Sequence, residues 1–258
     1  MGEERLFGGA RLAEPGDRAG RYVRPSPRVI RALDLLDRAI SLDPHYSPAL
    51  ALAAHSRTRI DLNNWTDDPA ANRREGIRLA RKALQSGADD PVVLANAGLA
   101  LGYFGEDLDA ALRLGERGLA LDPSYFFGWL QSGWLHLFAG RTTIAIEHFE
   151  TSLRLDPRGN RGNALAGVGL AHFFSRRFDE ALEKLLLALE ESPSFITGHR
   201  FLAACYAHLG RLHEAREVIE RLRAMNPAVL ESATRFRNPE HRELYLSGLR
   251  LAMGEEAP

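Results

Sequence analysis

The chain repeats a short set of landmarks at intervals of about 34 residues, and this period constrains its fold more than any other feature. A proline preceded by a polar residue recurs at Pro123, Pro157, Pro193 and Pro227. Small residues keep the same step at Ala110, Ala145, Ala181 and Ala215. A period of this length predicts stacked copies of one supersecondary unit, because a single unit cannot bury its apolar face alone.

Each copy of the unit is predicted to contain two helices. Apolar residues between the landmarks recur with the period of an α-helix over segments joined by short turns, and no run of β-branched residues shows the alternation of a strand. Ser26 is expected to cap a helix opened by Pro27. The expected helices are 27–42, 46–62, 70–86, 91–104, 107–121, 124–139, 142–155, 162–175, 178–191, 195–209, 212–225 and 240–252.

The order of residue sizes in "AGRTTIAIEHFETSLRLDP" (139–157) predicts how two helices of a pair approach each other. Small residues permit a close approach of antiparallel helices, so we expect Gly133 and Ala145 to face each other. Phe149 would fill the space toward the next pair, and Gly140 would take the turn between the helices. The segment 47–87 departs from this pattern, because its turn holds about ten additional residues around Trp65. Trp65 is expected to fold back onto the helices.

Composition excludes several functional classes. The formal net charge of the 258 residues is −1, which predicts no general attraction to nucleic acid or to a membrane surface. The single cysteine, Cys205, excludes an internal disulfide framework and fits a reducing cytoplasmic compartment. We find no apolar run long enough to span a membrane. Residues 1–25 lack an apolar signal core and are expected to form a mobile or loosely docked arm.

The side chains that could perform chemistry are better explained by packing and capping. His136 and His172 occupy positions where a large interface side chain is expected, and Cys205 lies on an apolar helix face. Asp67 and Asp68 precede Pro69, where a polar loop caps a helix. No histidine pair has the spacing of a zinc-binding helix, and no nucleophile elbow or phosphate loop is present. We therefore expect no enzyme activity, no cofactor and no metal.

The repeated unit resembles the tetratricopeptide repeat (TPR) family. The stretch "WLQSGWLHLFAGRTTIAIEHFETSLRLDP" is similar to its signature at six positions, namely Trp129, Gly133, Gly140, Ala145, Phe149 and Pro157. The resemblance spans roughly 27–227 and implies an all-α fold: a right-handed superhelical solenoid of about five helix-turn-helix repeats with a C-terminal capping helix. It divides the chain into the arm at 1–25, the solenoid at 26–227, and the capping helix and tail at 228–258.

A narrower resemblance concerns function. The segments "NNWTDDPAANRREGIRLARKAL" and "FRNPEHRELYLSGLRLAM" are similar to the C-terminal TPR half of multidomain bacterial regulators that carry a class III adenylate cyclase or a winged-helix domain. Neither additional domain is present in the chain. The sequence is thus expected to be a fragment or a shortened relative, serving as the regulatory or assembly part of a bacterial signalling system.

The family resemblance also implies a concave groove lined by the first helix of each repeat. Carried over residue by residue, the groove positions are Arg59, Asn96, Leu99, Tyr103, Phe127, Leu130, Gln131, Trp134, Asn163, Leu170, Phe174 and Arg200. The middle of this set is apolar and aromatic, which favours an apolar or amphipathic protein or peptide segment as partner. The N-terminal arm, with Leu6, Phe7, Leu12 and Tyr22, is an alternative occupant.

Three functions follow from the sequence and remain open at this stage. The first is a non-catalytic protein-binding scaffold with its partner in the groove. The second is self-association into a homo-oligomer, because a solenoid that begins in the middle of a repeat exposes an unfinished end. The third, an enzyme, has the least support, because no acid, base or nucleophile stands out.

Overall fold

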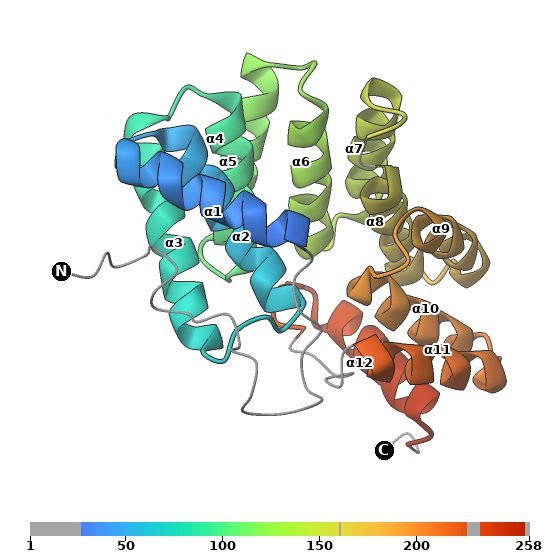
Figure 1. Ribbon diagram of the computed structural model, residues 1–258. Coiled ribbons are helices and arrows are strands. Elements are labelled where there is room, and N and C mark those ends of the chain that lie inside the picture. Colours follow the sequence, from blue (N-terminus) through green and yellow to red (C-terminus); the bar gives the residue numbers. More distant parts are fainter. Residues whose placement is uncertain (1–26, 160, 226–232, 256–258) are drawn as a thin grey trace. The chain divides into compact units, whose positions relative to one another are not determined.

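The computed structural model describes residues 27–159, 161–225 and 233–255, and these residues form twelve α-helices (Figure 1). The predicted all-α fold is confirmed, and every predicted helix lies within two residues of an observed one. Ser26 and the arm at 1–25 lie outside the described residues. The helices are α1 (Pro27–Leu42), α2 (Ser47–Leu62), α3 (Pro69–Ser86), α4 (Pro91–Tyr103), α5 (Leu108–Leu121), α6 (Phe126–Phe138), α7 (Thr142–Leu155), α8 (Arg161–Phe174), α9 (Phe178–Glu191), α10 (Ile196–His208), α11 (Leu212–Met225) and α12 (Pro239–Met253).

The chain divides into two compact units, with the boundary between Pro123 and Ser124. Unit 1 contains α1 to α5, and unit 2 contains α6 to α12. Five antiparallel pairs follow the predicted repeats: α2 with α3, α4 with α5, α6 with α7, α8 with α9, and α10 with α11. The arrangement of helix pairs is TPR-like, with α1 before the first pair and α12 after the last.

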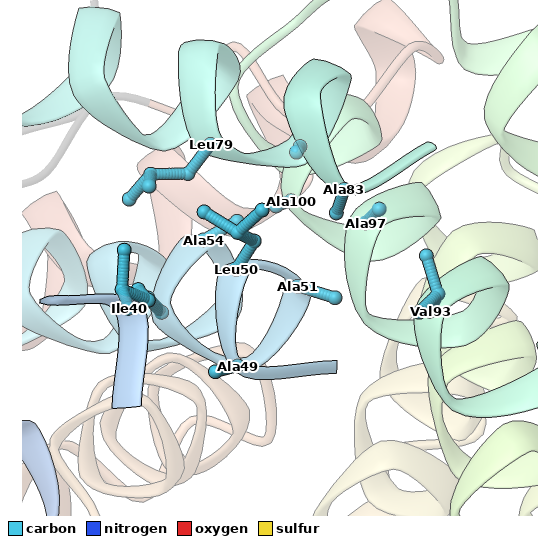
Figure 2. Packing of buried hydrophobic residues seen from close by; sticks show 12 residues of the cluster. Ile40, Ala49, Leu50, Ala51, Ala54, Leu79, Ala83, Val93, Ala97 and Ala100 are labelled. Carbon is cyan, nitrogen blue, oxygen red and sulfur yellow. The ribbon is translucent and has the colours of Figure 1, made fainter. Parts of the chain in front are cut away.

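The core of unit 1 is built largely from alanine. Figure 2 shows Ala51 of α2 on the side of Ala83 of α3 and Ala97 of α4, and Ala49 and Ala54 of α2 belong to the same buried cluster. Side chains this small let the helix axes approach closely, and the larger side chains of Ile40, Leu50, Leu79 and Val93 fill the remaining space. The alternation of small and large residues that defines the repeat in sequence is therefore what lets successive pairs stack.

Aspartate side chains begin several of these helices. Asp68 accepts a hydrogen bond from the backbone N–H of Ala71 at 2.8 Å, which confirms the predicted capping role. Asp90 accepts from Val92 at 2.8 Å, and Asp107 accepts from Ala110 at 2.9 Å. Proline follows Asp68 and Asp90 at the first helical position, where its missing N–H costs nothing.

The additional residues of the first pair lengthen its helices more than its turn. The turn between α2 and α3 is residues 63–68, while α3 has 18 residues against 14 in α5, α7, α9 and α11. The expectation of a turn enlarged by about ten residues is therefore wrong, because most of the insertion continues the helical hydrogen bonding. Trp65 is half-buried, and its backbone N–H donates to the carbonyl of Ile60 at 2.9 Å.

In unit 2, Phe149 of α7 is the side chain around which neighbouring helices pack. It is fully buried, and its ring occupies the space beside Gly133 of α6 and Gly167 of α8. A Cβ atom at Gly133 would lie 2.6 Å from Phe149 Cε1, and one at Gly167 would lie 2.3 Å from Phe149 Cζ. The nearest neighbours of Gly133 are thus atoms of Phe149, so the glycine makes room for the aromatic ring, a contact that the predicted pairing of Gly133 with Ala145 did not include.

The turns inside the pairs share one backbone conformation. Gly105, Gly140 and Gly210 have φ values of +75°, +80° and +75°, in the left-handed region where glycine has no Cβ to clash. Gly140 therefore takes the predicted turn. Asn64 occupies the equivalent turn between α2 and α3 with φ +53°, and Arg176 that between α8 and α9 with φ +58°, so two pairs hold the same geometry without glycine.

The C-terminal helix α12 closes unit 2. It packs against α10 and α11, and Leu244, Tyr245 and Leu249 are buried there. Asn238 caps its start by accepting from the backbone N–H of Glu240 at 2.9 Å, and Gly254 ends it with φ +82°. Among the helices described, none has the length and apolar character needed to cross a bilayer.

Candidate peptide-binding face

The first helices of the pairs carry the residues predicted to line a groove, and unit 1 holds four of them. Arg59 is exposed on α2. Tyr103 is half-buried at the end of α4, and its hydroxyl donates to Asp61 Oδ2 at 2.7 Å. Asn96 and Leu99 are buried within the unit. Arg59 and Tyr103 therefore reach the surface, whereas Asn96 and Leu99 belong to the packed interior.

In unit 2, most of the predicted groove residues are buried between helices. Leu130, Gln131, Leu170 and Arg200 are at most 2 % exposed. These positions lie on the first helices α6, α8 and α10, as predicted, but their side chains pack against neighbouring elements. They can support a binding surface from below, and they do not themselves form one.

Trp134 and Asn163 connect α6 to α8. The indole N–H of Trp134 donates to Asn163 Oδ1 at 3.0 Å, which fixes the orientation of the ring. The ring packs edge-on against Phe149, with 5.3 Å between the centroids, and the side chain is 9 % exposed. Asn163 is exposed, and Phe127 at the start of α6 is half-buried. The surface available to a partner here consists of Asn163, Phe127 and the remaining exposed part of Trp134.

The C-terminal ends of α6, α8 and α10 are covered by the chain itself. Phe236 lies in the segment before α12 and is 1 % exposed. Its ring is 5.9 Å from Phe138, 4.8 Å from Phe174 and 6.1 Å from Phe201, centroid to centroid. Four aromatic residues from four elements thus form one cluster, and offset or edge-on contacts of this kind stabilise it beyond the area they bury.

Backbone and side-chain hydrogen bonds hold this C-terminal segment in place. The backbone N–H of Arg237 donates to the carbonyl of Phe138 at 2.7 Å. Arg242 Nη1 donates to the carbonyl of Phe236 at 2.8 Å. His208 Nε2 lies 2.7 Å from the carbonyl oxygen of Leu244. The segment before α12 contains a turn, closed by a hydrogen bond from the backbone N–H of Phe236 to the carbonyl of Ala233, and it is joined to α6 by the Arg237 backbone bond and the Phe236 ring.

This cover changes the prediction for Phe174. His241 stacks on the Phe174 ring with an interplanar angle of 8°, and the Phe236 ring packs edge-on against it. Phe174 is therefore only 5 % exposed. The expected open aromatic surface from Phe127 to Phe174 is therefore interrupted at Phe174. The sequence contained one usable signal: Phe236 is the single aromatic residue in the polar stretch "ESATRFRNPEHRE". The alternative occupant, the N-terminal arm, lies outside the described residues.

Burial shifts the pKa values of His136 and Cys205 in unit 2 so that both side chains are uncharged near neutral pH. Burial lowers the pKa of His136 to about 4, and the ring of His148 lies edge-on to it at 4.8 Å. Burial raises the pKa of the Cys205 thiol to about 12, and Cys205 Sγ donates to the carbonyl of Phe178 at 3.0 Å. A neutral imidazole and a protonated thiol suit an interior, and a thiol that stays protonated is a poor nucleophile.

The side chains that could bind a metal ion are dispersed over the part of the chain that the structure describes. No cluster of three or more His, Cys, Asp or Glu side chains is placed to hold a metal ion there. His172 is half-buried, and burial lowers its pKa. The geometry of the described residues therefore offers surfaces for binding and no assembled set of reacting groups.

Comparison with known proteins identifies the repeat. Residues 130–195 and 169–229 match the tetratricopeptide repeat family, and these stretches contain helix pairs of unit 2. The comparison with curated proteins gives no match. Proteins with this repeat generally mediate protein–protein interactions, and their fold is typically non-catalytic.

Solved structures with the same arrangement of helices are TPR-like solenoids. The Cut9–Hcn1 hetero-tetramer of APC/C superposes with a TM-score of 0.60 at 18 % identity, over 86 % of this chain and 40 % of that one. MamA from Desulfovibrio magneticus gives 0.49 at 19 % identity, over 68 % and 94 %. YrrB, described as a TPR protein with an unusual peptide-binding site, gives 0.45 at 22 % identity, over 68 % and 91 %. At these identities the likeness concerns the fold.

Proposed function

We propose that the chain is a non-catalytic scaffold that binds an apolar or amphipathic segment of another protein on the first helices of unit 2. One observation carries this proposal: unit 2 already holds a short non-helical segment of its own chain, with Phe236 inserted among Phe138, Phe174 and Phe201. Phe127 of α6 and Asn163 of α8 present a second stretch of surface that is at least partly exposed. A surface that binds one aromatic peptide segment has the chemistry to bind another.

The binding site that we propose lies at Phe127, Trp134 and Asn163. Asn163 presents a side-chain amide at an exposed position and can exchange hydrogen bonds with a partner backbone. Its bond to Trp134 Nε1 keeps the amide in a fixed orientation before binding, which lowers the entropic cost of association. Phe127, at the start of α6, adds half-buried aromatic area to the proposed site. Leu130, Gln131 and Leu170 lie beneath and give the surface its rigidity.

In unit 1, Arg59 and Tyr103 form a separate, more polar surface. The Tyr103 hydroxyl is bound to Asp61, so this surface has both a cation and a carboxylate. We assign it an auxiliary role toward charged parts of a partner. The biological setting that we propose is the regulatory or assembly part of a bacterial signalling system in the cytoplasm, which the resemblance of residues 63–84 and 236–253 to such regulators supports.

We also propose a division of the chain into an arm (1–25), a solenoid (26–227) and a capping region (228–258). The packing of α12 against α10 and α11 supports the last boundary, because the end of a solenoid needs one face for the core and one for water. Self-association is the second candidate function, and the opposite charges of α3 and α9 favour it.

Site-specific photocrosslinking tests the proposed binding site. A photoreactive amino acid replaces Asn163 in one variant and the exposed Glu220 of α11 in a control variant, and both are irradiated in lysate of the native organism. We expect a discrete crosslinked protein from position 163 and none from position 220. The crosslink should decrease when Phe127→Ala is added, because that change removes aromatic contact area. Equal crosslinking at both positions, or no effect of Phe127→Ala, would contradict the proposal.

A further inference from the structure

Helix α3 of unit 1 carries a basic stripe over a surface depression. Arg74, Arg78, Arg81 and Gln85 follow one another at intervals of three or four residues, so they share one face of the helix. With Ile77, Lys82 and Glu106 they line a depression of about 550 Å³. Ile77 is half-buried and gives the depression an apolar element, while the cations surround it.

Two carboxylates partly balance these cations. Glu75 binds Arg78 at 2.7 Å, and Glu106 binds Arg81. Arg74 and Lys82 add two further positive charges, so the cations exceed the carboxylates around the depression. Because the Arg78 and Arg81 side chains are 50 % and 65 % exposed, their ion pairs are weak and can rearrange toward another anion.

Helix α9 of unit 2 carries a complementary stripe. Asp179, Glu183, Leu186 and Glu190 are spaced by four, three and four residues and share one face of the helix. Leu186 is 40 % exposed, with carboxylates before and after it. Lys184 binds Glu183 at 2.9 Å and is the single cation within the helix. The stripe on α3 has the same spacing, from Arg74 to Gln85, with the opposite charge.

We propose that α3 of one copy of this chain binds α9 of a second copy. Leu186 would enter the depression beside Ile77, and Glu183 and Glu190 would meet Arg78, Arg81 and Lys82. The carboxylates lie one turn before and after Leu186, so more than one ion pair can form while Leu186 is in the depression, and the buried leucine adds apolar contact area at the centre. Exposed leucines on a helix are common, but this one lies in a stripe whose complement occurs on the same chain.

The two halves of this contact differ, so the assembly is head-to-tail. Each copy has one α3 and one α9, and every added copy presents a new α3 or a new α9. Such a heterologous contact produces a ring if the rotation closes and an open chain of copies if it does not. The proposal uses neither Phe127 nor Asn163, and therefore it stands or fails separately from the binding of a partner on the first helices.

Charge reversal on each half tests this contact. One variant carries Arg78→Glu with Arg81→Glu, and the other carries Glu183→Arg with Glu190→Arg. A control variant reverses two exposed arginines of α11, Arg216→Glu with Arg223→Glu. The mass of each protein is followed by sedimentation velocity over a range of concentrations. Thermal melts of the same samples establish that each variant is folded.

We expect the mass of the wild-type protein and of the control to rise with concentration. Each charge-reversed variant should show a dissociation constant weaker by about tenfold or more, because like charges then face each other. Mixing the two variants should restore assembly, since the unchanged acidic α9 of the first can bind the unchanged basic α3 of the second. Raising the salt from about 50 mM to about 500 mM should weaken the wild-type assembly, because exposed charges are screened.

Leu186→Ser tests the apolar part without changing charge, and it should weaken association while the melting temperature changes little. A wild-type protein that stays monomeric at every concentration would overturn the proposal. It would do so even if α3 were then found to bind an acidic segment of a different protein. Assembly that is unchanged in the charge-reversed variants, or that is not restored by mixing them, would overturn it as well.

Discussion

Replacing Gly133 by alanine should destabilise unit 2, because Phe149 has no space to move. The new Cβ would lie 2.6 Å from Phe149 Cε1 and 2.7 Å from Cδ1, well inside van der Waals contact. The Phe149 ring cannot move toward α8, because it already packs directly against Gly167, where even a Cβ atom would lie 2.3 Å from Phe149 Cζ. Relief therefore requires a backbone shift or an unfavourable rotamer.

The magnitude follows from two opposing effects. Overpacking of a close-packed core costs about 1–3 kcal/mol. Alanine stabilises a helix interior relative to glycine by about 1 kcal/mol. The difference is about 0–2 kcal/mol, and we expect a loss toward the upper end because the clash is with a fully buried ring; 2 kcal/mol lowers the melting temperature by about 4–8 °C at this chain length.

Gly98 provides the matched control, because it occupies the equivalent position in α4. A Cβ there would lie 3.3 Å from Leu114 Cβ and 3.3 Å from the carbonyl oxygen of Ala111, which small adjustments can accommodate. Gly98→Ala should thus be close to neutral. Thermal and urea unfolding of both variants, together with Phe149→Leu and the double variant, gives the coupling energy between positions 133 and 149. If Gly133→Ala is as stable as Gly98→Ala, the steric argument is refuted.

Three further predictions concern buried side chains. The pKa of His136 is about 4 in the folded state, so the unfolded state binds more protons below pH 6.5; stability should fall from pH 6.5 toward pH 4, and at pH 5 by about 2 kcal/mol. Because burial also lowers the pKa of His55, His199 and His208, the loss for the whole protein should be larger, and His136→Phe should remove only the share of His136 in melts between pH 7.5 and 5. His213→Phe, at an exposed position, is the control. Phe236→Ala should lower the free energy of unfolding by about 3–5 kcal/mol in urea titrations, and an unchanged midpoint would show that the aromatic cluster does not hold the C-terminal segment. Cys205, with a pKa of about 12, should react with a thiol reagent at pH 8 only after denaturant is added; rapid labelling of the folded protein would contradict its burial.

The period in the sequence was sufficient to predict the helices and their pairing. Proline after Asp122 and Asp156 and the small residues near 34-residue spacing marked the beginning and the close contacts of each pair. These signals are local, since each depends on the preferences of a few neighbouring residues. The contact of Gly133 with the ring of Phe149 was not predicted, because spacing alone cannot tell whether a small residue makes room for a backbone or for a ring.

The candidate site was less predictable, because it depends on contacts between residues far apart in the sequence. Repeat positions placed Leu130, Leu170 and Arg200 on the correct helices, but their exposure depends on what packs over them. No periodicity connects Phe236 to Phe138 and Phe174, which lie in other repeats. A polar stretch with one aromatic residue is compatible with a free tail or with an inserted segment, and the pattern of the sequence does not distinguish them.

The contact between Phe138 and Phe236 also bears on how the protein is made. In an ordinary array of repeats each pair touches its neighbours, so a growing chain can complete one pair after another as it leaves the ribosome. Here the end of α6 receives its aromatic and backbone partners from residues that are synthesised almost a hundred positions later. Until then Phe138, Phe174 and Phe201 lack the ring that covers them, and the nascent protein carries an apolar surface that invites aggregation or a chaperone. Closing so long a loop is slow, and because the contact joins α6 to the segment before α12, we expect unit 2 to resist fraying from its last repeat.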